Sequence, residues 1–221
     1  MSQPLVIAVD GPAASGKGTI AKRLAGEFHL PMLDTGLLYR AVGQHMADLG
    51  LDLDDEVAAE RTARGFALEW LVDERLRTRA AGEQASRVAR YPGLRRALRQ
   101  FQQDFALQPG GAVLDGRDIG TVIAPWAGVK LWIDADVGVR AHRRFRELAG
   151  RGETVEEAQI LADLVARDAR DAPQMQIAAD AIRLDTTRLG VEEAVAAALA
   201  AVKARVQTWQ APASGADEAG P

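Results

Sequence analysis

A short glycine-rich segment near the N-terminus has the residue types and spacing needed to bind phosphate. Gly11 and Gly16 enclose four residues, and Lys17 follows directly. Such glycines let backbone amides fold around an anion, the lysine reaches the β- and γ-phosphates, and a helix starting there adds its positive end. The sequence therefore predicts a loop that binds a nucleoside triphosphate, made of Gly11, Pro12, Ala13, Ala14, Ser15, Gly16, Lys17, Gly18 and Thr19.

The residue after Lys17 departs from the strict form of this motif. Gly18 stands where a hydroxyl residue is usual, and the hydroxyl follows at Thr19. Mg²⁺ keeps several waters and bridges phosphates, so we expect the nucleotide to hold the metal, with no direct protein ligand unless Thr19 is one. The form Gly-Lys-Gly-Thr is typical of small-molecule kinases. The Asn-Lys-x-Asp motif of GTPases is absent from the sequence.

The elements that must position this loop follow from apolar runs that alternate with helical patterns. A continuous run at 5–9 ends at the loop, as in a strand buried on both faces, and Ile20, Leu24 and Phe28 recur as on an amphipathic helix. Asp34 or Thr35 can cap a further helix that runs toward Leu49. The alternation predicts an α/β fold with a parallel sheet. Further strands are expected at 112–114, 129–133 and 181–184, and further helices at 137–149, 155–170 and 191–207.

Two stretches fall outside this alternation. Residues 50–110 are charged and mostly helical in pattern, which indicates an insert in the sheet domain rather than another repeat of it. Residues 209–221 consist largely of Ala, Gly, Pro, Ser and acidic residues, so we expect a disordered tail there.

Composition excludes several classes of protein. The 221 residues include no cysteine, so disulfides and thiolate metal sites are impossible, and we expect a cytoplasmic protein. The net charge of −4 opposes nucleic-acid binding, and no apolar stretch is long enough for a membrane span. Of the 27 basic residues four are lysines, which leaves 23 arginines, whose planar fork suits phosphate. A monomer is the default expectation.

Four blocks of sequence resemble the bacterial cytidylate kinases, a branch of the nucleoside monophosphate kinases among the P-loop NTPases. The resemblance runs from about Leu5 to Ala204. It implies a three-layer α/β/α fold with a five-stranded parallel sheet, and transfer of the ATP γ-phosphoryl group to CMP or dCMP with Mg²⁺. The blocks are 9–19, 33–40, 115–122 with its Asp-Gly-Arg-Asp, and 140–144 together with Arg167-Asp168 and Asp185-Thr186-Thr187.

The resemblance also implies roles for residues and segments. The core would comprise 1–49 and 111–208, with a lid at about 150–176, and 50–110 would bind the acceptor. Lys17 and the loop amides would hold ATP. The catalytic cations would be Lys17, Arg117 and Arg167, and we add Arg170 as a hypothesis of our own. The acceptor CMP would be held by Thr35, Arg40, Ser86, Arg95, Arg117, Asp118, Arg167 and Asp171, with Asp118, Arg95 and Ser86 reading the cytosine.

Two departures from the family pattern keep other functions open. The insert is short, so the small β-ribbon of the family is expected to be truncated, and Gln174 stands where the family has an arginine. Arg170 could supply the missing lid cation. The alternatives are a P-loop kinase for another nucleotide or small metabolite and a catalytically weak nucleotide-binding module. A nucleic-acid-binding role ranks last.

Overall fold

A five-stranded parallel sheet organises the protein, which was analysed as a computed structural model describing residues 4–210. The strand order is β2-β3-β1-β4-β5, so β1 lies at the centre of the sheet. This confirms the predicted fold class. The strands are β1 (Leu5–Asp10), β2 (Met32–Asp34), β3 (Gly111–Gly116), β4 (Val129–Asp134) and β5 (Ile182–Asp185).

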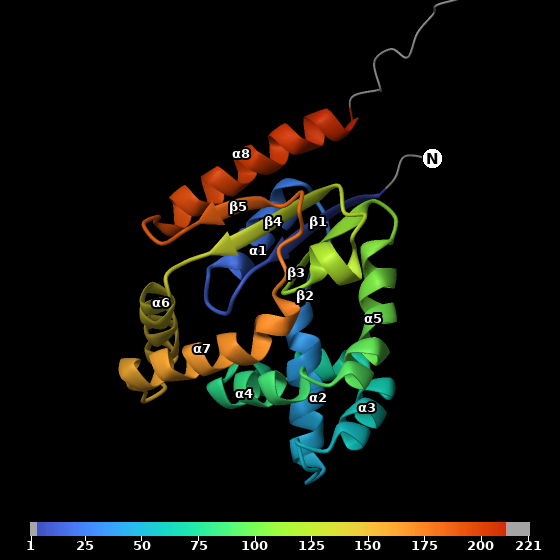
Figure 1. The fold of residues 1–221 in the computed structure, drawn as a ribbon, viewed down its shortest axis with the longest axis vertical. Helices are drawn as coiled ribbons and strands as arrows, with labels where there is room; N and C mark the ends of the chain where they lie inside the picture. The colour runs from blue at the N-terminus through green and yellow to red at the C-terminus, as the bar shows by residue number, and fades with distance from the viewer. Residues whose placement is uncertain (1–3, 211–221) are drawn as a thin grey trace, which may run out of the picture.

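Helices cover both faces of the sheet, which explains why β1 is apolar from Leu5 to Val9 (Figure 1). Val6 and Ala8 pack into one core with α2 (Thr35–Asp48) and α5 (Pro92–Ala106). Ile7 and Val9 pack into a second core with α1 (Lys17–Glu27) and α8 (Val191–Gln210). Successive side chains of a strand point to opposite faces, so a strand with helices on both sides has no polar side.

The region 50–110 is helical and contains no strand. It comprises α3 (Glu56–Arg64), α4 (Arg79–Val88) and α5, with short 3₁₀ turns at Leu68–Val72 and Glu74–Arg77. Asp55 caps α3 and Thr78 caps α4 through their side-chain oxygens. Helices α3 and α4 pack on α2, and α5 packs on α3. The family's small β-ribbon is lacking here, as the short sequence suggested. The proposed domain boundaries themselves stay a prediction.

Two helices after β4 pack against each other and reach the insert. They are α6 (Val137–Gly150) and α7 (Glu157–Asp171), and a short turn at Ala172–Gln174 follows. Figure 1 shows α7 lying alongside α4, and contacts between these helices agree. The side chains that α7 carries therefore face the insert across the carboxyl ends of the strands.

Most expected elements are present, with two differences. The three-residue strand β2 was not recognised as a strand in the sequence. Helix α8 runs to Gln210, past residue 209 where the tail was expected to start, and residues 211–221 lie outside the described residues. Within residues 4–210, no helix is both long and apolar enough to cross a membrane.

Candidate active site

The glycine-rich loop joins β1 to α1 and takes the backbone shape that an anion site requires. Ala14 and Gly16 have left-handed backbone angles, with φ of 60° and 92°. Gly16 is the N-cap of α1, and no side chain caps the helix. The amide of Thr19 donates to the Gly16 carbonyl oxygen, which leaves the amides of Lys17 and Gly18 to a ligand, as at helix N-termini that bind phosphate.

Close approach of β4 requires glycine at the start of the loop. A Cβ atom on Gly11 would lie 2.0 Å from the carbonyl oxygen of Ile133, and its φ is 150°. We expect Gly11→Ala to lower the free energy of unfolding by about 3 kcal/mol or more and to weaken ATP binding. Denaturant unfolding, extrapolated to zero denaturant, measures the change in the free energy of unfolding.

The matched control for this substitution is Gly26→Ala. Gly26 lies on α1, and a Cβ there would meet no atom within 4 Å. Alanine in a helix is favoured over glycine by about 0.5–1 kcal/mol, so this variant should be at least as stable as the wild type. Equal stability of the two variants would contradict the steric argument at Gly11.

Lys17 forms a buried ion pair with the neighbouring strand. Its Nζ lies 3.0 Å from Asp115 Oδ1, and the two side chains are 14% and 3% exposed. Burial lowers the pKa of Lys17 while Asp115 opposes that change, and burial raises the pKa of Asp115. A Cβ on Gly18 would lie 3.1 Å from Asp115 Oδ2, so the carboxylate explains why glycine follows the lysine.

Asp10 links the end of β1 to the turn after β3. Its two carboxylate oxygens accept hydrogen bonds from the amides of Ile119 and Gly120, at 2.9 and 2.8 Å. This turn follows Asp118 directly, so Asp10 holds the backbone beside that candidate base-reading residue. Burial raises the pKa of Asp10 to about 6.

The raised pKa of Asp10 predicts a pH-dependent stability. A carboxyl with a pKa of 3.8 unfolded and about 6 folded binds its proton more tightly in the folded state. Its stabilising contribution is complete below the unfolded pKa and is lost as the pH rises through the folded pKa. We expect the free energy of unfolding to fall by about 1 kcal/mol between pH 5 and pH 7.5 relative to Asp10→Asn. Parallel pH curves for the two proteins would refute this.

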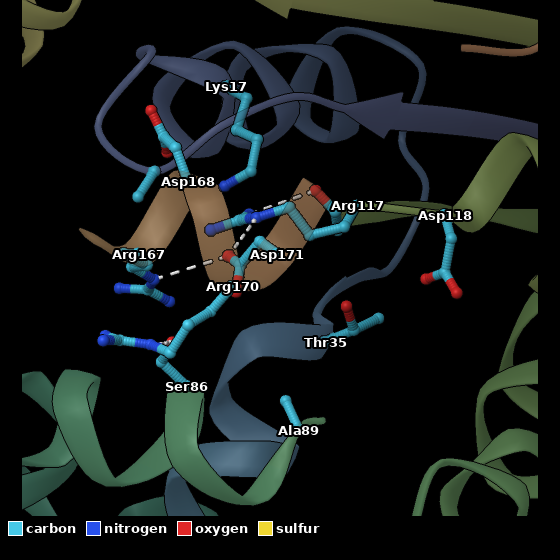
Figure 2. Close-up of polar contacts among 12 residues, drawn as sticks. Lys17, Thr35, Ser86, Ala89, Arg117, Asp118, Arg167, Asp168, Arg170 and Asp171 are labelled. Atoms are coloured by element: carbon cyan, nitrogen blue, oxygen red, sulfur yellow. Dashed lines mark hydrogen bonds and ion pairs between the residues drawn. The ribbon is translucent and has the colours of Figure 1, made fainter. Parts of the chain in front are cut away.

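A cleft of about 580 Å³, open to solvent, brings together most of the predicted acceptor residues. It is lined from β3, α2, α4, α5 and α7, and Figure 2 shows several of these side chains converging. The predicted residues that line it are Thr35, Ser86, Arg95, Arg117, Asp118, Arg167, Arg170 and Asp171, and Gln174 lines it too. Arg40 is not among the residues lining this cleft.

One wall of the cleft presents an acid next to a guanidinium. Arg95 forms an ion pair with Asp118, whose side chain is 9% exposed, and the Arg95 guanidinium lies 5.4 Å from the centre of the Tyr39 ring. Thr35 donates its hydroxyl hydrogen to the Asp115 carbonyl oxygen at 2.8 Å, which joins α2 to β3. The pair thus offers an acceptor and several donors side by side.

Arginines with few acidic partners gather at the opposite wall. Asp171 Oδ2 lies 3.2 Å from Arg117 Nε and 3.6 Å from Arg167 Nε (Figure 2). Burial lowers the pKa of Arg167 to about 10, and the like charges of Arg117 and Arg40 lower it further. One carboxylate shared by two guanidinium groups leaves this wall cationic. It is therefore suited to an anion.

Arg40 is placed behind this wall. It donates to the Leu76 carbonyl oxygen at 2.7 Å, and burial lowers its pKa. One of its terminal nitrogens and one of Arg167 each lie 3.6 Å from the position a Cβ of Gly82 would take. The two guanidinium groups thus approach each other over a glycine of α4, which leaves room for both.

Arg140 ties the phosphate loop to α7 and was not recognised as a site residue from the sequence. Its buried guanidinium donates to the carbonyl oxygens of Ala13 and Ala135 and to Asp168, at 3.2, 2.9 and 2.6 Å. Asp115 and Asp10 were missed in the same way. Each of these two acids follows an apolar run. An acid at the carboxyl end of a predicted central strand could have marked both as candidate site residues.

Comparisons with known proteins agree with these features. A family model described as cytidylate kinase matches residues 7–204. A cytidylate kinase of Methylobacterium sp. (strain 4-46) is 58% identical over 205 residues, which cover 91% of this chain and 98% of the relative. A cytidylate kinase of Caulobacter sp. (strain K31) is 53% identical over 212 residues, with coverages of 94% and 98%.

A solved structure supports the fold alone. Shikimate kinase from Bacteroides thetaiotaomicron matches with a TM-score of 0.50 at 15% identity, over 90% of this chain and 98% of that one. The family model, by contrast, spans nearly the whole described chain, including the loop, the cleft and α7. The chain belongs to the cytidylate kinase family.

Proposed function

We propose that this protein transfers the γ-phosphoryl group of ATP to CMP or dCMP, giving ADP and the corresponding diphosphate. The observation that carries the proposal is a cleft that combines the Arg95–Asp118 pair with Arg117 and Arg167, beside the phosphate loop. A nucleotide base needs paired donors and acceptors, and its phosphate needs cations. The cleft offers both at its two walls.

The phosphate loop binds the phosphoryl donor, and the cationic wall binds the phosphate of the acceptor. The free amides at the start of α1 and Lys17 hold the donor phosphates. Arg117 and Arg167 hold the acceptor phosphate, and Arg40, buried behind them, adds positive charge that reduces the repulsion between two anions. Because charge spreads over the transferred group in the transition state, catalysis rests on this positioning and on cationic stabilisation.

Asp118 accounts for the choice of base. The cytosine amine is a donor and would pair with this carboxylate, while N3 and O2 are acceptors for Arg95 and Ser86. Uracil would place an acceptor oxygen against Asp118. A buried polar group left without a partner rejects the wrong substrate strongly, so we expect cytosine to be preferred.

The residues present fit a magnesium ion that arrives with ATP. The Asp115 carboxylate is buried at the end of β3 beside Lys17, and oxygen is the ligand that Mg²⁺ prefers. Asp115 would hold the ion, directly or through water, and Thr19, which is exposed, is less suited. When bound, the ion would neutralise part of the negative charge of the phosphates.

The test is a coupled assay of ADP release with Mg-ATP and each of CMP, dCMP, UMP, AMP and GMP. Rates confined to CMP and dCMP would support the proposal. Turnover of another acceptor would assign a different kinase substrate, and ATP binding without turnover would indicate a nucleotide-binding module. We also propose that the protein acts as a monomer, in the cytoplasm and without nucleic acid. The mass of the protein in solution tests the first of these three predictions.

A further inference from the structure

The turn between β5 and α8 lies against the phosphate loop. The strands of the sheet are parallel, so this turn is at the same edge of the sheet as the loop (Figure 1). Thr186, in the turn, is only 1% exposed. Its hydroxyl contacts the loop, because Thr186 Oγ donates to the Ser15 carbonyl oxygen at 3.0 Å.

Two carbonyl oxygens of the phosphate loop are held by side chains from outside the loop. The Ala13 oxygen accepts from Arg140 Nη1 at 3.2 Å, and the Ser15 oxygen accepts from Thr186. The residues that follow these two, Ala14 and Gly16, have left-handed backbone angles. In such a backbone the amides turn toward a common point, where an anion can bind, and the carbonyl groups point away from it. Holding the carbonyl groups outward therefore keeps the amides directed at the phosphates.

Arg143 of α6 fixes the direction of the Thr186 hydroxyl. Its Nη1 donates to Thr186 Oγ at 3.0 Å, and its Nη2 donates to the Thr186 carbonyl oxygen at 2.6 Å. The hydroxyl has one hydrogen to donate, and the carbonyl oxygens of Ser15 and Asp134 both lie 3.0 Å from it. The Asp134 oxygen already accepts from the Thr186 amide at 2.8 Å. Within residues 4–210 the Ser15 oxygen has no other hydrogen-bond donor, so the hydroxyl hydrogen is needed at the phosphate loop.

We propose that Thr186 is a positioning residue that holds the phosphate loop in the shape that binds the phosphates of ATP. The proposal rests on the proposed function and extends it to a buried residue outside the loop. The Thr186 hydroxyl ties Ser15 to the end of β4 and, through Arg143, to α6. A loop that is ordered in advance loses less conformational entropy when the nucleotide binds. The bond therefore strengthens ATP binding and helps to align the γ-phosphoryl group.

The experiment measures the dissociation constant for ATP, and KM for CMP at saturating ATP, in the wild type and in Thr186→Val. Valine keeps the branched shape of threonine but has no hydroxyl, so the bond to Ser15 is lost. Loss of this hydrogen bond should raise the dissociation constant for ATP about tenfold. KM for CMP should not change, because Thr186 is not among the residues that line the acceptor cleft.

Two controls separate the hydroxyl from packing and from stability. Thr186→Ser keeps a hydroxyl that can accept from Arg143 and donate to Ser15, so it should bind ATP as the wild type does. Thr62→Val is the matched control, because Thr62 is buried on α3 and its hydroxyl donates to the Ala58 carbonyl oxygen at 2.8 Å. This substitution removes the same kind of bond in the insert. It should lower the free energy of unfolding and leave the affinity for ATP unchanged.

Arg143→Ala tests the same bond without changing Thr186, and it decides the question if Thr186→Val does not fold. Thermal unfolding of each variant identifies those that fold. A hydroxyl with no donor on its oxygen is free to turn away from Ser15, so the dissociation constant for ATP should rise in this variant too. A folded Arg143→Ala protein with the ATP affinity of the wild type would overturn the proposal.

The remaining results distinguish this proposal from the proposed function. An active wild type with an unchanged dissociation constant for ATP in Thr186→Val, or with equal losses of affinity for ATP and CMP, would overturn the role of Thr186 alone. Weak ATP binding by Thr186→Ser would do the same, because it would show that the shape of the side chain matters and not its hydroxyl. A wild type that binds ATP and responds to these substitutions but does not phosphorylate CMP would overturn the proposed acceptor and support the role of Thr186.

Discussion

Replacing Lys17 by alanine is expected to lower kcat for CMP phosphorylation by about a thousandfold. The lysine lies at the start of α1 beside Asp115, where no other lysine or arginine of the described chain forms an ion pair with that carboxylate. A donor aimed at charge that develops in the transition state contributes a factor of about 10²–10³ in rate. Steady-state rates of ADP release at saturating CMP measure the loss.

This substitution also leaves the buried Asp115 without its cation, which costs stability. Removing one partner of a buried pair destabilises a protein by about 3–5 kcal/mol. The double variant Lys17→Ala with Asp115→Asn should regain melting temperature but not activity. Lys22→Ala, at an exposed position of α1, is the matched control and should be fully active. A Lys17→Ala protein that kept its kcat would contradict the assignment.

Replacing Asp118 by asparagine is expected to lower kcat/KM for CMP by about a hundredfold or more. The substitution removes the ion pair with Arg95 and replaces a charged acceptor of the cytosine amine by a weaker, neutral one. An asparagine can turn its amide to donate, which suits uracil O4, so the value for UMP should rise relative to that for CMP. Initial rates with the two acceptors give the ratio.

Two measurements guard against an indirect effect of the Asp118 substitution. The affinity for ATP should not change, because the phosphate loop lies on β1 and α1. Asp104→Asn on α5, where the side chain is exposed, should leave both acceptors unaffected. An Asp118→Asn protein with the wild-type ratio of CMP to UMP would refute the role of Asp118 in reading the base.

The parts of the fold that depend on local pattern could be predicted from the sequence. The phosphate loop occupies consecutive residues, and β1, β3 and β4 are each built around a short, mainly apolar run. Strand β2 was not predicted because it has only three residues and passes directly into α2. Its last residue is also a helix cap, since the Asp34 carboxylate accepts from the Gly36 amide at 2.9 Å.

The parts of the site that depend on tertiary contacts could not be predicted from the pattern of residues. In the sequence Ser86 is one small residue of an alanine-rich helix, and nothing near it in the chain indicates a role. Only the folded structure shows that it lines the cleft. Arg167 and Asp171 are four residues apart and therefore share a face of α7. The spacing of residues on this helix does not show that Arg170 contacts Glu83 and Ser86 on another helix. The resemblance to a family, rather than residue spacing, brought these positions together.

The central place of β1 has a consequence for how the chain acquires its structure during synthesis. Both neighbours of β1 are strands that come after residue 110. Strand β2 pairs with β3, so it also cannot join the sheet before β3 has been made. Pairings so distant in sequence form slowly, and unpaired strands are prone to aggregate. The phosphate loop cannot take its final shape before β4 is made, because Gly11 lies against Ile133 of β4. Binding of ATP to a nascent chain therefore reports that the fourth strand has joined the sheet.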